Sequence, residues 1–154
     1  MQLKSNRSKV SIFSVLILFT LFNLKCDKNE EFYFPYTEFY LQFGIATDLH
    51  DLGDMDTKLF TGVDHGIGGI IIFKSFDNYF AFDAACTHEI PDKVCTVKKN
   101  SVIIWECPCC GSQFVFSSSG DYAFADVKNE TDSANFALKN YKAYSDGVYV
   151  YVSN

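Results

Sequence analysis

The sequence is poor in basic side chains: its 154 residues include 13 lysines and arginines against 19 aspartates and glutamates, a formal net charge of −6. Nucleic-acid binding needs clustered basic groups that neutralise phosphates, so this composition argues against a nucleic-acid partner. The length leaves room for one domain and argues against a multidomain enzyme. With 48% hydrophobic and 21% charged residues, the chain is also unlike a disordered or fibrous protein. We therefore expect one folded module.

A helical hydrophobic period is missing beyond residue 31, because no stretch there repeats apolar residues every three and four positions over three turns. Aromatic residues make up 17% of the chain and favour strands. Turn signals occur at Asp77-Asn78, at residues 117–121 and at Asp146-Gly147. Between such signals, apolar or alternating runs predict strands at residues 32–43, 68–73, 79–82, 102–106, 114–116, 138–144 and 148–152. The sequence predicts an all-β domain over residues 32–154.

The first 25 residues differ from the rest of the chain. They carry four basic side chains and no acidic one, whereas the remainder carries 9 basic and 19 acidic residues. An apolar run at residues 10–24 has the length of a signal-peptide core and is short for a bilayer span of about 20 residues. We interpret residues 1–25 as a signal peptide or, alternatively, an uncleaved membrane anchor. Both interpretations predict export.

Cys26 directly follows the apolar run, where a bacterial lipoprotein signal places its lipidated cysteine. The resemblance is incomplete, because Leu24 and Lys25 stand where a lipoprotein signal normally has small residues. It implies a lipidated Cys26 and a polar tether over residues 26–31, and hence a lipoprotein on the periplasmic or surface face of a bacterial membrane. The alternative is a free Cys26 thiol at the end of an anchor helix.

Five of the six cysteines lie between residues 86 and 110. The segments Cys86-Thr87-His88 and Cys107-Pro108-Cys109-Cys110 each follow a predicted strand. Core packing rarely produces such clustering, and thiolates with an imidazole are ligands for iron and zinc. The alternative is a set of disulfides, as in other small exported domains. His50 and His65 have no partner at a ligand spacing, so we interpret them as loop residues.

These two segments resemble the ligand boxes of Rieske iron–sulfur domains, which read Cys-Thr-His and Cys-Pro-Cys-His-Gly-Ser-x-Phe/Tyr. The resemblance covers residues 68–152 and departs from the family where Cys110 replaces the histidine of the second box. It implies a 2Fe–2S cluster held by Cys86, His88, Cys107 and Cys110. Thiolate binds iron as readily as imidazole does, and NEET-type proteins hold a 2Fe–2S cluster by three cysteines and one histidine.

The resemblance to Rieske domains implies further roles. A disulfide between Cys95 and Cys109 would clamp the two loops, and the Ser112 hydroxyl would donate to a cluster sulfur. The implied fold is an antiparallel β-sandwich with a small, loop-built metal-binding subdomain. The implied function is membrane-tethered electron transfer without catalysis, because a Rieske oxygenase needs a further mononuclear-iron domain for which the chain has no room. A basic redox partner would complement the acidic domain.

Zinc and metal-free disulfides are the alternatives to a cluster. Residues 107–111 satisfy the Cys-Pro-x-Cys-Gly knuckle of a zinc ribbon, and three cysteines with one histidine form an ordinary structural zinc set. The Cys86-x-His88 half is unlike a second zinc-ribbon knuckle. On either alternative the protein is an exported, lipid-anchored structural or interaction module without a cluster.

Overall fold

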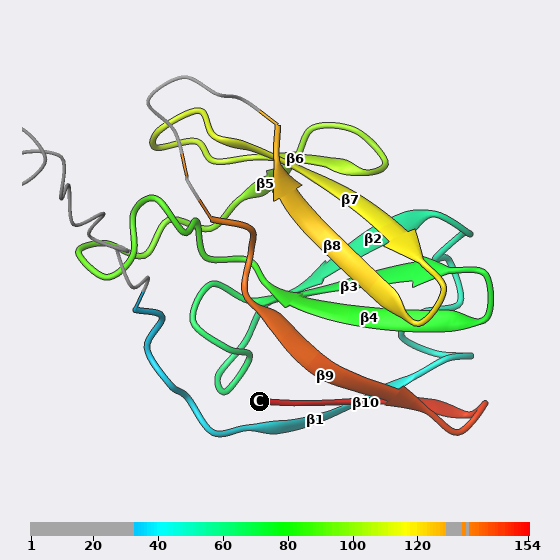
Figure 1. The fold of residues 1–154 in the computed structure, drawn as a ribbon. Coiled ribbons are helices and arrows are strands. Elements are labelled where there is room, and N and C mark those ends of the chain that lie inside the picture. The colour runs from blue at the N-terminus through cyan, green and yellow to red at the C-terminus, as the bar shows by residue number, and fades with distance from the viewer. Residues whose placement is uncertain (1–32, 129–133, 135) are drawn as a thin grey trace, which may run out of the picture. The chain divides into compact units, whose positions relative to one another are not determined.

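The computed structural model describes residues 33–128, 134 and 136–154, and confirms the all-β prediction (Figure 1). No helix occurs within these residues. Their strands are β1 (Tyr40–Gly44), β2 (Asp56–Phe60), β3 (Ile70–Ser75), β4 (Asn78–Asp83), β5 (Lys98–Lys99), β6 (Ile104–Glu106), β7 (Gln113–Ser119), β8 (Tyr122–Val127), β9 (Asn140–Ser145) and β10 (Tyr149–Ser153).

The strands form two antiparallel sheets. The larger sheet has the order β1-β10-β9-β4-β3-β2, and the smaller has the order β5-β6-β7-β8. In the larger sheet, β4 and β9 are joined through only two residue pairs, Ala81 with Tyr141 and Phe82 with Asn140. Figure 1 shows the smaller sheet lying across β3 and β4. The described part of the chain is therefore a sandwich-like, all-β domain.

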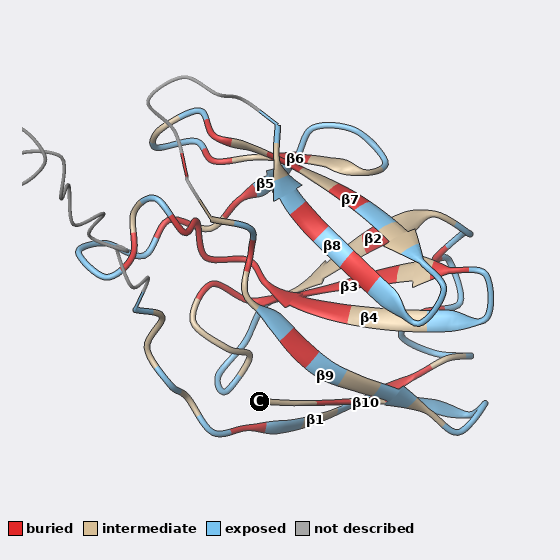
Figure 2. Cartoon of the chain, viewed as in Figure 1, coloured by how far each residue is buried: buried red, intermediate tan, exposed pale blue. Residues whose placement is uncertain are grey.

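Strand β3 lies between two hydrophobic cores, which explains its continuous apolar sequence. Ile71 and Phe73 point into the core between the two sheets, whereas Ile70 and Ile72 point into the core on the opposite face of the larger sheet. Successive side chains of a strand point to opposite faces, so a strand covered on both faces needs apolar residues at every position. Figure 2 accordingly shows β3 as almost wholly buried.

The core between the sheets also supports the cysteine segments. It includes Trp105 and Phe116 from the smaller sheet together with the buried residues Cys86, Cys95 and Cys107. The Trp105 indole N–H donates to the Thr57 hydroxyl on β2 at 2.9 Å. A hydrogen bond and a shared apolar core thus hold the smaller sheet against the larger one, and fix the strands from which the cysteine loops emerge.

One predicted strand and one predicted turn need correction. The strand predicted at residues 32–43 begins only at Tyr40, and Pro35, which cannot donate to a sheet, lies before it. The turn predicted at residues 117–121 is narrower, because β7 continues to Ser119 and the hairpin turns at Gly120.

Within β7, the Ser118 hydroxyl hydrogen bonds with the Ser75 hydroxyl of β3 at 2.7 Å, so both hydroxyl groups have a hydrogen-bond partner between the sheets.

The segments predicted to direct and anchor the protein, residues 1–25, Cys26 and the tether up to residue 31, lie outside the described residues. Among the residues that are described, no helix has the length and hydropathy needed to cross a membrane.

Candidate metal centre

The first cysteine loop begins where β4 ends. Its two ends are held together by a bridge between Ala85 and Thr96 and by the Cys86 backbone N–H, which donates to the Cys95 carbonyl at 2.9 Å. Inside the loop, the backbone N–H groups of Glu89 and Ile90 donate back to the Cys86 carbonyl. These bonds place the Cys86 thiol at the base of the loop.

The second cysteine loop connects β6 with β7. The Cys107 N–H donates to the Ser112 carbonyl, and the Gly111 N–H donates to the Cys107 carbonyl, both at 2.9 Å. Gly111 adopts a φ of +74°, a left-handed conformation that glycine accommodates without steric cost. The strands of the smaller sheet thereby close a tight loop that carries Cys107, Cys109 and Cys110.

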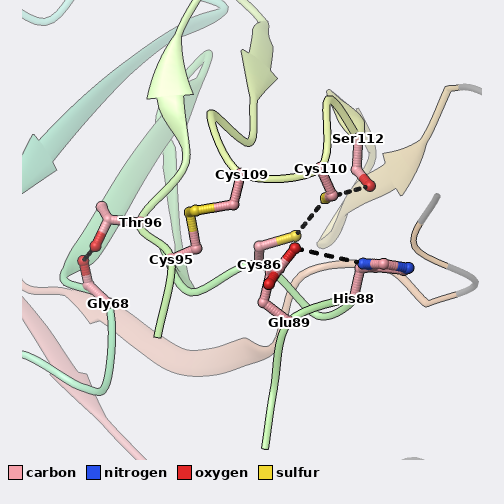
Figure 3. The surroundings of a disulfide bond; sticks show 9 residues. All are labelled: Gly68, Cys86, His88, Glu89, Cys95, Thr96, Cys109, Cys110 and Ser112. Atoms are coloured by element: carbon pink, nitrogen blue, oxygen red, sulfur yellow. Dashed lines mark hydrogen bonds and ion pairs between the residues drawn. A yellow bond between two sulfur atoms is a disulfide. The ribbon is translucent and has the colours of Figure 1, made fainter. Parts of the chain in front are cut away.

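A disulfide between Cys95 and Cys109 joins the two loops, with their Cα atoms 6.4 Å apart (Figure 3). Cys95 is buried whereas Cys109 is exposed. This is the pairing that the family resemblance implies. The disulfide holds the first loop against the second at one edge of the cysteine cluster.

The remaining cysteines of the two loops, Cys86, Cys107 and Cys110, are free thiols whose sulfur atoms all lie within 4.8 Å of one another. The Cys86 and Cys110 sulfurs are 3.6 Å apart (Figure 3). Cys86 and Cys107 are fully buried, and Cys110 is half-buried. These thiols form a group of three sulfur donors that could hold a metal ion.

His88 lies at the outer side of the thiol group. With Glu89 and Cys110 it forms a second group of possible ligands, whose donor atoms also lie within 4.8 Å of one another. Its Nδ1 is 3.6 Å from the Glu89 carboxylate, and its side chain is 42% exposed. Cys110 belongs to both groups, so all four ligands predicted from the sequence meet around it. Glu89 was not predicted, although a carboxylate directly after Cys86-Thr87-His88 is a signal that could have identified it.

The thiols differ in how readily they ionise. Burial raises the pKa of Cys86, the neighbouring Cys107 and Cys110 thiols raise it further, and the His88 backbone N–H opposes them only in part. For Cys110, burial also acts to raise the pKa, but hydrogen bonds from the Ser112 hydroxyl and backbone N–H, and from the other two thiols, outweigh it and leave the pKa lowered. Cys110 therefore ionises more readily than Cys86, and a metal ion beside Cys86 would favour its thiolate form.

Ser112 is fully buried beside the thiols. Its hydroxyl oxygen lies 3.0 Å from the Cys110 sulfur and accepts the Ala134 backbone N–H at 2.9 Å. The resemblance implies that the Ser112 hydroxyl donates to a cluster sulfur, which stays a prediction. In the structure this hydroxyl contacts the sulfur of Cys110, the residue that departs from the family pattern.

Asp83, the last residue of β4, holds the backbone at the start of the first cysteine loop by hydrogen bonds. Its fully buried carboxylate accepts backbone N–H groups from Ile67, Gly68 and Ala85 and the hydroxyl of Tyr141, at distances of 2.6–2.9 Å. Four donors satisfy the charge that burial would otherwise penalise. Sequence analysis missed this residue, and the available signal was an acidic residue at the end of an apolar strand.

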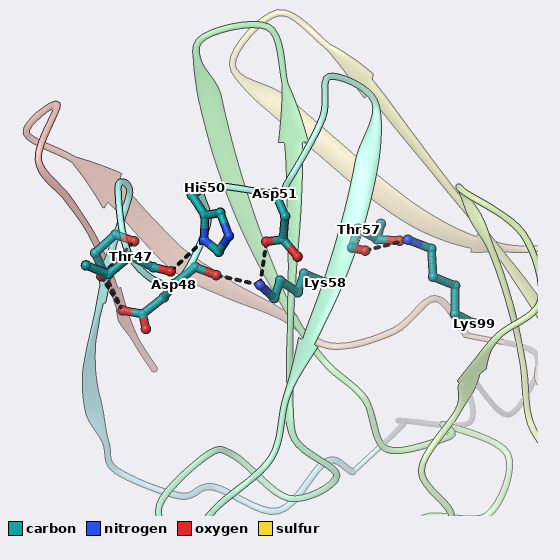
Figure 4. Close-up of polar contacts among 8 residues, drawn as sticks. Thr47, Asp48, His50, Asp51, Thr57, Lys58 and Lys99 are labelled. Atoms are coloured by element: carbon teal, nitrogen blue, oxygen red, sulfur yellow. Dashed lines mark hydrogen bonds and ion pairs between the residues drawn. The ribbon is translucent and has the colours of Figure 1, made fainter.

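The two other histidines lie in separate loops. The His50 ring makes a 2.8 Å hydrogen bond with the Thr47 carbonyl, near the ion pair between Lys58 and Asp51 (Figure 4). The His65 ring makes a 2.9 Å hydrogen bond with the Val63 carbonyl. Within the described residues, neither belongs to a group of possible metal ligands.

No family model matches the chain, and no curated protein matches its sequence. The resemblance to Rieske domains therefore rests on the residues themselves and stays a prediction.

Proposed function

We propose that the protein is a membrane-tethered, Rieske-like electron carrier that holds a 2Fe–2S cluster between its two cysteine loops. The observation that carries the proposal is the meeting of three free thiols with His88 at the junction of these loops, beside a disulfide that clamps them. The donors come from both sequence segments that resemble the family's boxes, and each segment contributes two.

The residues fit such a cluster. In Rieske centres one iron takes two cysteines and the other takes the two remaining ligands. The chain offers a fully buried pair, Cys86 and Cys107, and a more exposed pair, Cys110 and His88. When bound, the cluster would supply one-electron transfer. The exposed His88 side chain would then bring the site to the surface, where a redox partner can dock.

The rest of the proposal concerns the setting of the domain. Residues 1–25 would direct export and Cys26 would carry the lipid anchor, so the domain would face the periplasm or the outside of the cell. Beyond residue 25 the chain has 9 basic and 19 acidic residues, which favours a basic redox partner. The proposal assigns no catalysis to this chain.

The decisive experiment is anaerobic purification of the full chain in detergent, followed by visible absorption spectroscopy, metal analysis and electron paramagnetic resonance of the reduced sample. We expect about two irons per chain and the spectrum of a reduced 2Fe–2S cluster. His88→Ala should lose or bleach the cluster, while the matched loop variant His50→Ala should keep it. A colourless, iron-free protein would overturn the electron carrier.

A single zinc ion is the second candidate, favoured by the spacing of the sulfurs. A tetrahedral zinc with bonds of about 2.3 Å separates its thiolates by about 3.8 Å. The Cys86 and Cys110 sulfurs are 3.6 Å apart. On this alternative the protein is an exported, lipid-anchored structural or interaction module, with His88 or Glu89 as fourth ligand. One zinc per colourless chain in the same metal analysis would support it.

A further inference from the structure

We propose that Cys107, Cys95 and Cys109 form a thiol–disulfide exchange site that delivers a reactive thiol to the surface at Cys109 when no metal holds Cys107. The proposal rests on the proposed function in one respect only, namely that a bound metal, whether in a cluster or as zinc, uses Cys107 as a ligand.

The geometry of the sulfurs carries the proposal. Cys107 belongs to two groups at once: it lies with Cys86 and Cys110, and it lies with Cys95 and Cys109, and within each group the sulfur atoms are within 4.8 Å of one another. A free thiol therefore neighbours both sulfurs of a disulfide. A thiolate this close to both sulfurs lies beside the disulfide bond, and rotation of the side chains that brings it into line with the bond makes it the nucleophile of thiol–disulfide exchange.

The exchange is balanced without any oxidant. The Cys107 thiolate attacks the Cys95 sulfur, a Cys95–Cys107 bond forms, and the Cys95–Cys109 bond breaks. The proton released by Cys107 is taken up by the departing Cys109 thiolate. Attack on the Cys109 sulfur would instead bridge two residues of one tight loop and close a short, strained ring. Cys95 is therefore the sulfur that we expect to be attacked.

The exchange would move the free thiol from the interior to the surface, because the three residues differ in burial. Cys95 and Cys107 are buried, whereas Cys109 is exposed. The new disulfide would lie in the interior, and the free thiol would move from a buried position to the surface. There the Cys109 thiolate can attack a low-molecular-weight disulfide, forming a mixed disulfide at Cys109 and releasing one small thiol. Cys109 is thus the modification site that the exchange creates.

Metal binding opposes the exchange. A metal that binds Cys107 stabilises the isomer with the Cys95–Cys109 disulfide, because only that isomer leaves Cys107 free as a ligand. Linkage makes the effect reciprocal, so the Cys95–Cys107 isomer must bind the metal more weakly. Loss of the metal therefore produces a reactive Cys109 thiol at the surface.

The test uses the full chain in detergent, treated anaerobically with a chelator and divided into samples without metal and with added Zn²⁺. Acid quenching, alkylation with N-ethylmaleimide and mass-spectrometric mapping of disulfides at low pH then identify the bridges. We expect a Cys95–Cys107 bridge in the metal-free sample and at least about tenfold more alkylated Cys109 than with Zn²⁺. A metal-free chain with only the Cys95–Cys109 bridge would overturn the proposal, as would equal labelling of Cys109 in both samples.

Two matched variants, compared without metal, assign the nucleophile. Cys107→Ser should abolish the new bridge and the labelling of Cys109. Cys110→Ser removes a different thiol of the same group and should leave both in place; loss of the exchange in this variant contradicts the assignment to Cys107. Bridges scattered over all six cysteines would indicate exchange in an unfolded chain and would also overturn the proposal. The iron and zinc contents are measured in a separate experiment. A protein that contains no iron but still forms the Cys95–Cys107 bridge would refute the proposed electron carrier and leave the exchange proposal intact.

Discussion

The hydroxyl of Ser112 lies 3.0 Å from the sulfur of Cys110 and at the same time accepts the backbone N–H of Ala134. Because the oxygen serves as acceptor toward the backbone, its own proton is available to the sulfur. Ser112 thus acts in two directions: it stabilises the Cys110 thiolate, and it holds residue 134 against the second cysteine loop.

Removing that hydroxyl should affect both functions. In Ser112→Ala, we expect the pKa of Cys110 to rise and the free energy of unfolding to fall by about 1–3 kcal/mol, because the Ala134 N–H is left buried without a partner. The pH dependence of Cys110 alkylation in metal-free protein, together with urea unfolding, measures the two effects. Ser117→Ala, at an exposed position of β7, is the matched control and should change neither. An unchanged Cys110 pKa contradicts the assigned hydrogen bond.

Cys110→His restores the residue of the family pattern and tests the charge at the proposed cluster. Replacing a thiolate by a neutral imidazole removes one negative charge beside the irons, which favours reduction. We expect the wild-type potential to lie between about −400 and −150 mV, and the variant to move into the Rieske range of about −150 to +300 mV. A redox titration followed by visible absorption measures both. A wild-type potential above about 0 mV would contradict the effect assigned to Cys110.

Gly68 is a position where a side chain cannot be accommodated. A Cβ there would overlap the backbone nitrogen of Ala85, next to Cys86. We expect Gly68→Ala to lower the free energy of unfolding by about 3 kcal/mol and to weaken metal binding, because the first cysteine loop must shift. Gly120→Ala is the comparison: it meets no atom within 4 Å, and only its φ of +61° opposes the substitution. Gly120→Ala should lower the free energy of unfolding by about 1 kcal/mol and leave metal binding unchanged.

Thr57 links the two sheets through its hydroxyl, which donates to the Val102 carbonyl at 2.7 Å and accepts the Trp105 indole N–H. In Thr57→Val the indole N–H stays buried without an acceptor, so we expect a loss of about 1–3 kcal/mol in chemical unfolding. Thr57→Ser keeps the hydroxyl and should lose only about 0.8 kcal/mol, the contribution of one buried methyl group. Equal losses in the two variants would assign the effect to packing instead.

The buried Tyr141 hydroxyl donates to the Asp83 carboxylate at 2.7 Å. Burial first, and then the Asp83 carboxylate, raises the pKa of Tyr141 above its ordinary value of 10.0. As pH rises above about 10, the unfolded chain loses this proton before the folded one does, so the free energy of unfolding should fall by up to about 1.4 kcal/mol per pH unit. Tyr141→Phe should lack this contribution to the slope, whereas Tyr122→Phe, at an exposed position, should retain it.

The sequence predicts much of the fold where strands have bulky apolar residues. The run that became β3 is evident because apolar residues follow one another without interruption, and the run that became β10 is evident because valine alternates with tyrosine. Strand β8 escaped prediction because its buried side chains are Ala123 and Ala125, which carry a weak strand signal. Strand β5 has only two residues, Lys98 and Lys99, both exposed, and it exists through its pairing with β6.

Prediction of the site was limited in a different way. The sequence supplies the thiols and His88, but six cysteines allow about 15 complete pairings, and spacing alone does not choose among them. Only the resemblance pointed to Cys95 and Cys109. Three of the four contacts of Asp83 could not be predicted, because Ile67, Gly68 and Tyr141 are 15–58 residues away in sequence.

The sequence by itself determined the chemistry that is available: an acidic, strand-forming chain with five cysteines and one histidine between residues 86 and 110. The tertiary structure decided which of these groups are neighbours. Sulfurs of Cys86 and Cys110 come within 3.6 Å because β4 and the β6–β7 hairpin pack on one core and project their loops together. The same packing places Cys107 between the free thiols and the disulfide. Neighbour relations of this kind depend on long-range packing, which local sequence patterns do not encode.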